Sequence, residues 1–107
     1  MKKTLLAVLL SISCSATAAD LASTIKQDYQ QHLGALFKHF HQHPELSHME
    51  TETAKRLAKE LRAAGFDVTE GVGKTGIVAM LENGPGPLVM MRADMDGLPV
   101  EEKSGLP

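Results

Sequence analysis

The sequence predicts an α/β fold in which two helices precede the strands of one sheet. Before Gly65, two stretches carry apolar residues at helical spacing, and after it short apolar runs alternate with glycine and proline. One of these runs, Leu88–Met91, is uninterrupted, which is typical of a strand buried on both faces. Helices packed against such a strand give a layered domain. The 107 residues leave room for one small domain.

Residues 1–19 have the pattern of a secretory signal peptide, which leaves residues 20–107 for the folded domain. Two lysines form the positive start, an apolar segment follows, and Ala16–Ala18 matches a cleavage site. The apolar segment is shorter than the roughly 20 residues that span a bilayer. Cys14 leaves a lipoprotein alternative open, although the residues before it match that pattern poorly. We expect a periplasmic or secreted protein, free of the membrane and of cysteine after cleavage.

The first predicted helix runs from Asp20 to His43. Its apolar side chains recur at spacings of three and four and form one stripe, with glutamine, lysine and aspartate opposite. Pro44 ends it, because proline disfavours helical geometry in the residue before it. The residues of the stripe are Leu21, Ile25, Tyr29, Leu33, Leu36, Phe37 and Phe40.

A second helix is predicted to follow at once and to end at Gly65. Ser47 and Glu50 have the spacing of a capping box, in which each side chain accepts from the amide of the other residue. Gly65 suits the left-handed position that closes a helix. The inward face is formed by Ala54, Leu57, Ala58, Leu61 and Ala64.

Three strands are predicted after this helix, over residues 66–69, 77–81 and 88–91. A glycine-rich loop, Gly71–Gly76, separates the first two, and a turn rich in glycine and proline precedes the third. The loop contains Gly-Lys-Thr, which resembles the end of a phosphate-binding P-loop. That motif requires a glycine where Val68 stands and a helix afterwards, whereas a strand is predicted. Nucleotide binding is therefore disfavoured.

The candidate functional residues follow the third predicted strand. Arg92, Asp94 and Asp96 come directly after it, and Gly97 and Pro99 end any regular element. In open α/β sheets, ligands bind outside the carboxyl ends of the strands. Asp94 and Asp96 are two residues apart, so an extended backbone places both side chains on one side. Converging carboxylates repel each other unless a cation, a proton or a histidine lies between them, and metal binding is the leading hypothesis. Solvated acids at a strand end are the equally weighted alternative.

The histidines at positions 39, 41 and 43 also suggest a metal pair. On a helix, however, only His39 and His43 share a face, and a surface cluster is favoured. Methionines could bind copper, but on apolar strands they are expected to fill the core. A net charge of −2, one tyrosine and no tryptophan exclude the basic or aromatic surface of a nucleic-acid-binding protein. These methionines are Met80, Met90, Met91 and Met95.

Four motifs in combination resemble the metallopeptidase family of aminoacylases, hippurate hydrolases and related N-acyl-amino-acid amidohydrolases. In chain order they are His41–Ser47 (His-Gln-His-Pro-Glu-Leu-Ser), Thr75–Ala79 (Thr-Gly-Ile-Val-Ala), Arg92–Pro99 (Arg-Ala-Asp-Met-Asp-Gly-Leu-Pro) and Gly105–Pro107. None of them would be specific alone. The resemblance extends over nearly everything after residue 19, with the motifs in matching order.

The resemblance implies that residues 20–107 are the N-terminal part of a zinc-exopeptidase-like catalytic domain, with the first strands of its mixed sheet. It implies hydrolysis of the amide bond of N-acyl amino acids or small peptides at a centre of two divalent metals of the zinc or manganese type. It also allows a homodimer of the complete enzyme. The aspartate pattern of this chain resembles that of the family branch that takes its metal ligands from a later His-Ala-Cys-Gly-His-Asp motif. We expect the metal ligands to lie beyond this chain and the fragment to be inactive alone.

By the same resemblance, Asp96 and Asp94 are the candidate catalytic-site residues. Asp96 matches the aspartate that orients a ligand histidine, and Asp94 stands where related branches have that histidine. Two other functions stay open. One is a small exported binding module without catalytic activity, in which these acids and histidines are surface groups. The other is a barrel-type metal-dependent amidohydrolase, which would need His39 and His41 on a strand.

Overall fold

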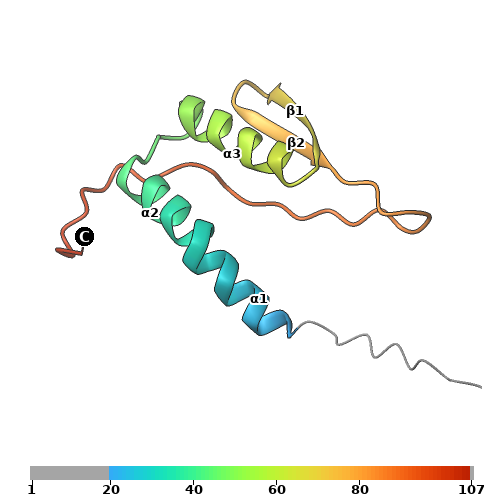
Figure 1. The fold of residues 1–107 in the computed structure, drawn as a ribbon. Helices are drawn as coiled ribbons and strands as arrows, with labels where there is room; N and C mark the ends of the chain where they lie inside the picture. Colours follow the sequence, from blue (N-terminus) through green and yellow to red (C-terminus); the bar gives the residue numbers. More distant parts are fainter. Residues whose placement is uncertain (1–19, 107) are drawn as a thin grey trace, which may run out of the picture. The chain divides into compact units, whose positions relative to one another are not determined.

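The α/β class is confirmed by the computed structural model, which describes residues 20–106. Helices α1 (Leu21–Asp28), η1 (Tyr29–Leu33), α2 (Gly34–Gln42) and α3 (Thr51–Ala63) precede strands β1 (Asp67–Val72) and β2 (Gly76–Met80) (Figure 1). The chain divides after Gly34 into two compact units. The predicted signal peptide over residues 1–19 lies outside the described residues and stays a prediction. None of the described helices is long and apolar enough to cross a membrane.

The predicted first helix is confirmed, with one local change inside it. α1 begins after Asp20, whose carboxylate accepts a hydrogen bond from the N–H of Ala22 at 3.2 Å. Over η1 the backbone widens into a π-helix, in which the N–H of Gly34 donates to the carbonyl of Tyr29, five residues earlier. Apolar spacing does not reveal this turn.

The end of α2 agrees with the sequence. The last helical residue is Gln42, and Pro44 follows two positions later. The N–H of His43 still donates to the carbonyl of His39 at 3.1 Å, and the two imidazole rings lie 4.7 Å apart. His41 lies on another face, where its ring stacks with Phe37. Because His39 and His41 are helical, the barrel-type arrangement that needs them on a strand is excluded.

The predicted capping box at the start of α3 is wrong. Ser47 lies in a turn several residues before the helix, and Glu50, at the N-cap, makes no capping hydrogen bond with its side chain. The carboxylate of Glu45 caps the helix instead. It accepts from the N–H groups of Glu52 at 3.2 Å and Thr53 at 2.7 Å. Because of the intervening turn, the free N–H groups of the first turn of α3 lie near Glu45 and not near Ser47.

α3 ends as predicted and packs on a hairpin. Gly65 has a φ of 92°, and the N–H of Phe66 donates to the carbonyl of Leu61 at 3.0 Å, which together close the helix with a Schellman motif. β1 and β2 pair antiparallel from Asp67 opposite Met80, with an irregularity next to Gly71. α3 contacts both strands, and Ala58, 0% exposed, is the most buried residue of the helix.

The third predicted strand is wrong. Residues 88–91 form no strand, and their side chains are exposed, up to 96% for Met91. A strand requires a neighbour for its N–H and C=O groups. Within residues 20–106, the only paired strands are β1 and β2. The prediction that methionines fill the core is wrong for the same reason at Met90 and Met91, and it is also wrong at Met80 in β2, which is 46% exposed.

Candidate functional site

The residues that follow this exposed stretch return to the corner between α2 and α3. Figure 1 shows the chain passing from the turn after β2 back to that corner. There Gly97 forms a bridge of parallel sense with Leu46, and its N–H donates to the carbonyl of Glu45 at 2.7 Å. We call Ala93–Gly97 the acidic segment and Pro44–Leu46 the corner. Two of the motifs recognised in the sequence therefore lie in direct contact.

The contact at Gly97 is closer than any side chain would allow. A Cβ atom built there would lie 2.7 Å from the Cβ of Pro44 and 3.6 Å from the carbonyl oxygen of Glu45. The first distance is shorter than real Cβ contacts, and proline has no flexible end that could move away. Glycine is thus required by the packing at this point of the Asp-Gly-Leu-Pro sequence.

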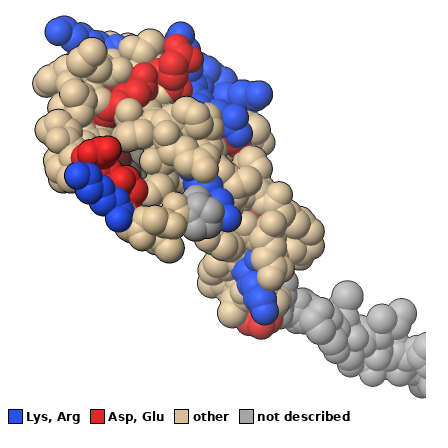
Figure 2. Space-filling view, turned by 90° about the vertical axis from the view of Figure 1, so that its left-hand side faces the viewer, with Lys and Arg blue, Asp and Glu red and all other residues tan. Residues whose placement is uncertain are grey.

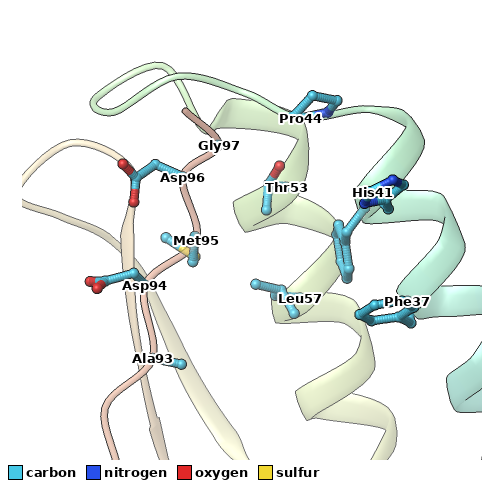
Figure 3. A pocket seen from close by; sticks show the side chains of 11 residues that line it. Phe37, His41, Pro44, Thr53, Leu57, Ala93, Asp94, Met95, Asp96 and Gly97 are labelled. Carbon is cyan, nitrogen blue, oxygen red and sulfur yellow. The ribbon is translucent and has the colours of Figure 1, made fainter. Parts of the chain in front are cut away.

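An open pocket of about 390 Å³ lies between the acidic segment and the two helices (Figure 3). α2 contributes Phe37, Phe40 and His41 to it, and α3 contributes Thr53 and Leu57. The helical wall is therefore mostly apolar, and the acidic segment forms the opposite wall, with its two carboxylates directed away from the helices. A small ligand with an apolar group matches such a pocket.

Asp94 and Asp96 both lie at this pocket, on the same side of the extended segment. Figure 3 shows their carboxylates directed away from Thr53 and Leu57, while the backbone of the segment faces α3. The carboxylate of Asp94 pairs with the guanidinium of Arg92, and its side chain is 66% exposed. An exposed pair of this kind contributes little to stability. Both carboxylates are therefore accessible to other groups.

The described residues do not fit a metal centre by themselves. Over residues 20–106, no group of three or more histidine, cysteine, aspartate or glutamate side chains lies close enough to hold an ion. A closed divalent site takes about four protein ligands and a catalytic one about three. A centre that uses Asp94 or Asp96 would need ligands from outside the described residues.

Sequence reasoning missed the roles of two glutamates next to the pocket. Glu50 is 7% exposed and accepts a hydrogen bond from the hydroxyl of Thr75 at 2.6 Å, which lowers the pKa of its carboxyl. Thr75 is the first residue of Thr75–Ala79, another of the motifs that carry the family resemblance. The bond therefore connects the start of α3 to the hairpin. No local signal reveals it, because the two residues are far apart in sequence.

The other glutamate, Glu45, makes the stability of the corner depend on pH. The hydrogen bond from the backbone N–H of Thr53 is the largest cause that lowers the pKa of Glu45 below its usual 4.5. A lowered pKa in the folded state means that the stabilisation is present above the unfolded pKa. It is lost as the pH falls through the folded pKa.

We therefore expect Glu45→Gln to lower the urea midpoint of unfolding at pH 7 and to have a smaller effect at pH 3. Equilibrium unfolding at the two pH values measures this. Glu82→Gln, in the exposed turn after β2, is the control, and it should leave the urea midpoint nearly unchanged at both pH values. An equal loss at pH 7 and pH 3 would show that the charge of Glu45 has no part in the capping.

His41 lies between this pocket and a second one of about 400 Å³. Its Nε2 is 3.5 Å from a carboxylate oxygen of Glu102, and both side chains are about half exposed. Hydrogen bonds from Ser104 are the main cause of the lowered pKa of Glu102, and His41 adds to them. On the face seen in Figure 2, acidic and basic side chains lie beside one another among uncharged ones.

Comparison with known proteins finds related hydrolases. The chain is 42% identical over 90 residues to thermostable carboxypeptidase 2 of Saccharolobus solfataricus, which covers 79% of this chain and 23% of that protein. It is 40% identical over 79 residues to the N-acetyl-L-cysteine deacetylase of Bacillus subtilis, covering 73% of this chain and 19% of that protein. It is 40% identical over 81 residues to the hippurate hydrolase of Campylobacter jejuni, which covers 75% of this chain and 21% of that protein.

These matches confirm the resemblance predicted from the motifs. The chain spans about a fifth of the length of these curated relatives. No family model matches the chain, and no solved structure matches it at a significant level.

Proposed function

This chain is homologous to part of the family of N-acyl-amino-acid amidohydrolases and carboxypeptidases, and from that premise we propose that the protein hydrolyses the amide bond of an N-acyl amino acid or small peptide. The observation that carries the proposal is the contact between the acidic segment and the corner at one pocket. Motifs that are far apart in the sequence are brought together there. Two related hydrolases, named for N-acetyl-L-cysteine and for hippurate, share this stretch of sequence.

The residues of this chain would contribute the rim of the active site. Asp96 and Asp94 would supply carboxylates that orient neighbouring groups, since both are accessible at the edge of the pocket. Carboxylates of this kind hold a histidine in one tautomer through a hydrogen bond to its ring N–H. The apolar side chains of α2 and α3 would exclude water from one side of the pocket.

We also propose that the activity depends on divalent metal of the zinc or manganese type, two ions per enzyme. Such ions polarise a scissile carbonyl and lower the pKa of a bound water. Because the described residues do not form a metal centre, the ligands would come from outside residues 20–106. The 107-residue chain alone would then be inactive.

The test is the release of glycine from N-benzoylglycine by the native protein, as its cell produces it. We expect hydrolysis that a chelator abolishes and that zinc or manganese restores. The isolated 107-residue chain, assayed in parallel with the same metals, should release no glycine. Hydrolysis that survives complete metal removal would contradict the metal dependence. Failure to cleave any N-acyl amino acid or dipeptide would contradict the function itself.

A further inference from the structure

The peptide between Asp96 and Gly97 is held against the corner by two different contacts. The N–H of Gly97 donates to the carbonyl of Glu45 at 2.7 Å, and the missing Cβ of Gly97 allows Pro44 to approach. A peptide unit is planar, so the N–H of Gly97 and the carbonyl of Asp96 turn together. The hydrogen bond therefore fixes the backbone of Asp96 on its carboxyl side.

The corner that accepts this hydrogen bond is itself anchored by the same residue. While the backbone carbonyl of Glu45 holds Gly97, its carboxylate accepts from the N–H groups of Glu52 and Thr53 in the first turn of α3. A negative charge is also favoured at the N-terminus of a helix. Glu45 thus connects the acidic segment to a helix through its backbone on one side and its side chain on the other.

A second contact stabilises the start of that helix. The buried carboxylate of Glu50 accepts from the hydroxyl of Thr75, in the turn between β1 and β2. α3 packs against both strands of the hairpin. The position of the corner is therefore tied to the most buried part of the unit.

We propose that Glu45 and Gly97 form a positioning clamp that sets the orientation of Asp96 at the pocket. This inference rests on the proposed function and adds two residues that touch no substrate to those that activity requires. Gly97 acts through the backbone of Asp96, and Glu45 acts through Gly97. Misplacement of an active-site group by about 1 Å can lower the rate about 100-fold, so a small shift of this peptide is enough to be measured.

The test compares alanine at two glycines in the native protein. In Gly97→Ala the new methyl group meets Pro44, whereas in Gly86→Ala it enters open space, and neither glycine has a positive φ. We expect Gly97→Ala to lower kcat for N-benzoylglycine about 10- to 100-fold with KM within about twofold. Gly86→Ala should keep both values. A kcat for Gly97→Ala within twofold of that of Gly86→Ala would overturn the clamp.

A second arm separates positioning from loss of folding. Pro44→Gly removes the atom that the new methyl group meets, so the effect of Gly97→Ala on kcat should be several times smaller in that background. Glu45→Gln keeps an acceptor oxygen and should retain more activity than Glu45→Ala. Equal effects of Gly97→Ala in both backgrounds, or equal losses in the two Glu45 variants, would contradict the proposal.

A third arm is independent of activity and separates failure of the clamp from failure of the function. In the native protein, the amide of Gly97 should exchange with solvent at least 10-fold more slowly than that of Gly86. Glu45→Ala, which keeps the accepting carbonyl but loses the side-chain anchor, should reduce the difference. If no N-acyl amino acid is cleaved but this protection is found, the proposed function fails and the clamp stands. If Gly97 exchanges as fast as Gly86, the clamp is contradicted whatever the enzyme cleaves.

Discussion

Replacing Asp96 with alanine in the native protein is expected to lower turnover or metal affinity by about 10- to 100-fold. Carboxylates that orient a ligand from outside the coordination sphere usually contribute effects of this size. Asp96 lies at the pocket next to the residue that joins the acidic segment to the corner, so its position is defined by the fold. Steady-state kinetics on N-benzoylglycine and measurement of bound metal test the expectation.

The matched control for this variant is Asp67→Ala. Asp67 is exposed in β1 and does not line the pocket, so its removal changes the net charge equally without altering the site. We expect Asp67→Ala to keep the wild-type rate and metal content. An unchanged rate and unchanged metal content in Asp96→Ala would show that Asp96 is not part of the active site.

The largest expected effect on folding is that of Ala58→Asp. Ala58 is 0% exposed in α3, the helix that packs on the hairpin, so a carboxylate placed there would be removed from water. Burying an unpaired charge costs several kcal/mol, comparable with the 5–15 kcal/mol that typically stabilises a domain. We expect the variant to lose its cooperative unfolding transition in circular dichroism.

Ala63→Asp is the control for that substitution. Ala63 lies in the same helix but is exposed, so the same change leaves the new carboxylate in water. An acid near the C-terminus of a helix is unfavourable by only about 0.3–1 kcal/mol. Ala63→Asp should therefore unfold cooperatively at a slightly lower temperature. Cooperative unfolding of Ala58→Asp at the temperature at which Ala63→Asp unfolds would show that α3 does not pack as described.

Local patterns predicted the elements that local interactions determine. The stripe from Leu21 to Phe40 predicted the first helix, Pro44 its end, and Gly65 the end of the second. The hairpin followed from two short strands separated by glycines. In each case the residues that decide the structure are neighbours in the sequence, which is where periodicity and turn chemistry apply.

The prediction failed where a distant partner decides the outcome. Leu88–Met91 has the composition of a buried strand, but a strand needs a neighbour, and within the described residues the paired strands lie elsewhere. Ser47 has the spacing of a cap, yet a turn brings Glu45 to the helix instead. The composition of a segment indicates which structure it can adopt, but the rest of the fold must supply the strand or amide groups that it pairs with.

The candidate site was predictable in part. Spacing indicated that Asp94 and Asp96 share a side, and the motifs indicated the family. Neither could show that Gly97 packs on Pro44 or that Glu50 bonds to Thr75. These contacts join motifs across the fold and are visible only in three dimensions.

The claim that the acidic segment borders the substrate site is tested most directly by binding a non-cleavable N-acyl amino acid analogue to the native protein. Backbone amide signals in nuclear magnetic resonance report which residues the analogue approaches. We expect the signals of Asp94, Asp96 and Gly97 to shift while those of Gly84 and Gly86, in the turn after β2, stay unchanged. Binding that shifts other signals and leaves the acidic segment unaffected would contradict the claim.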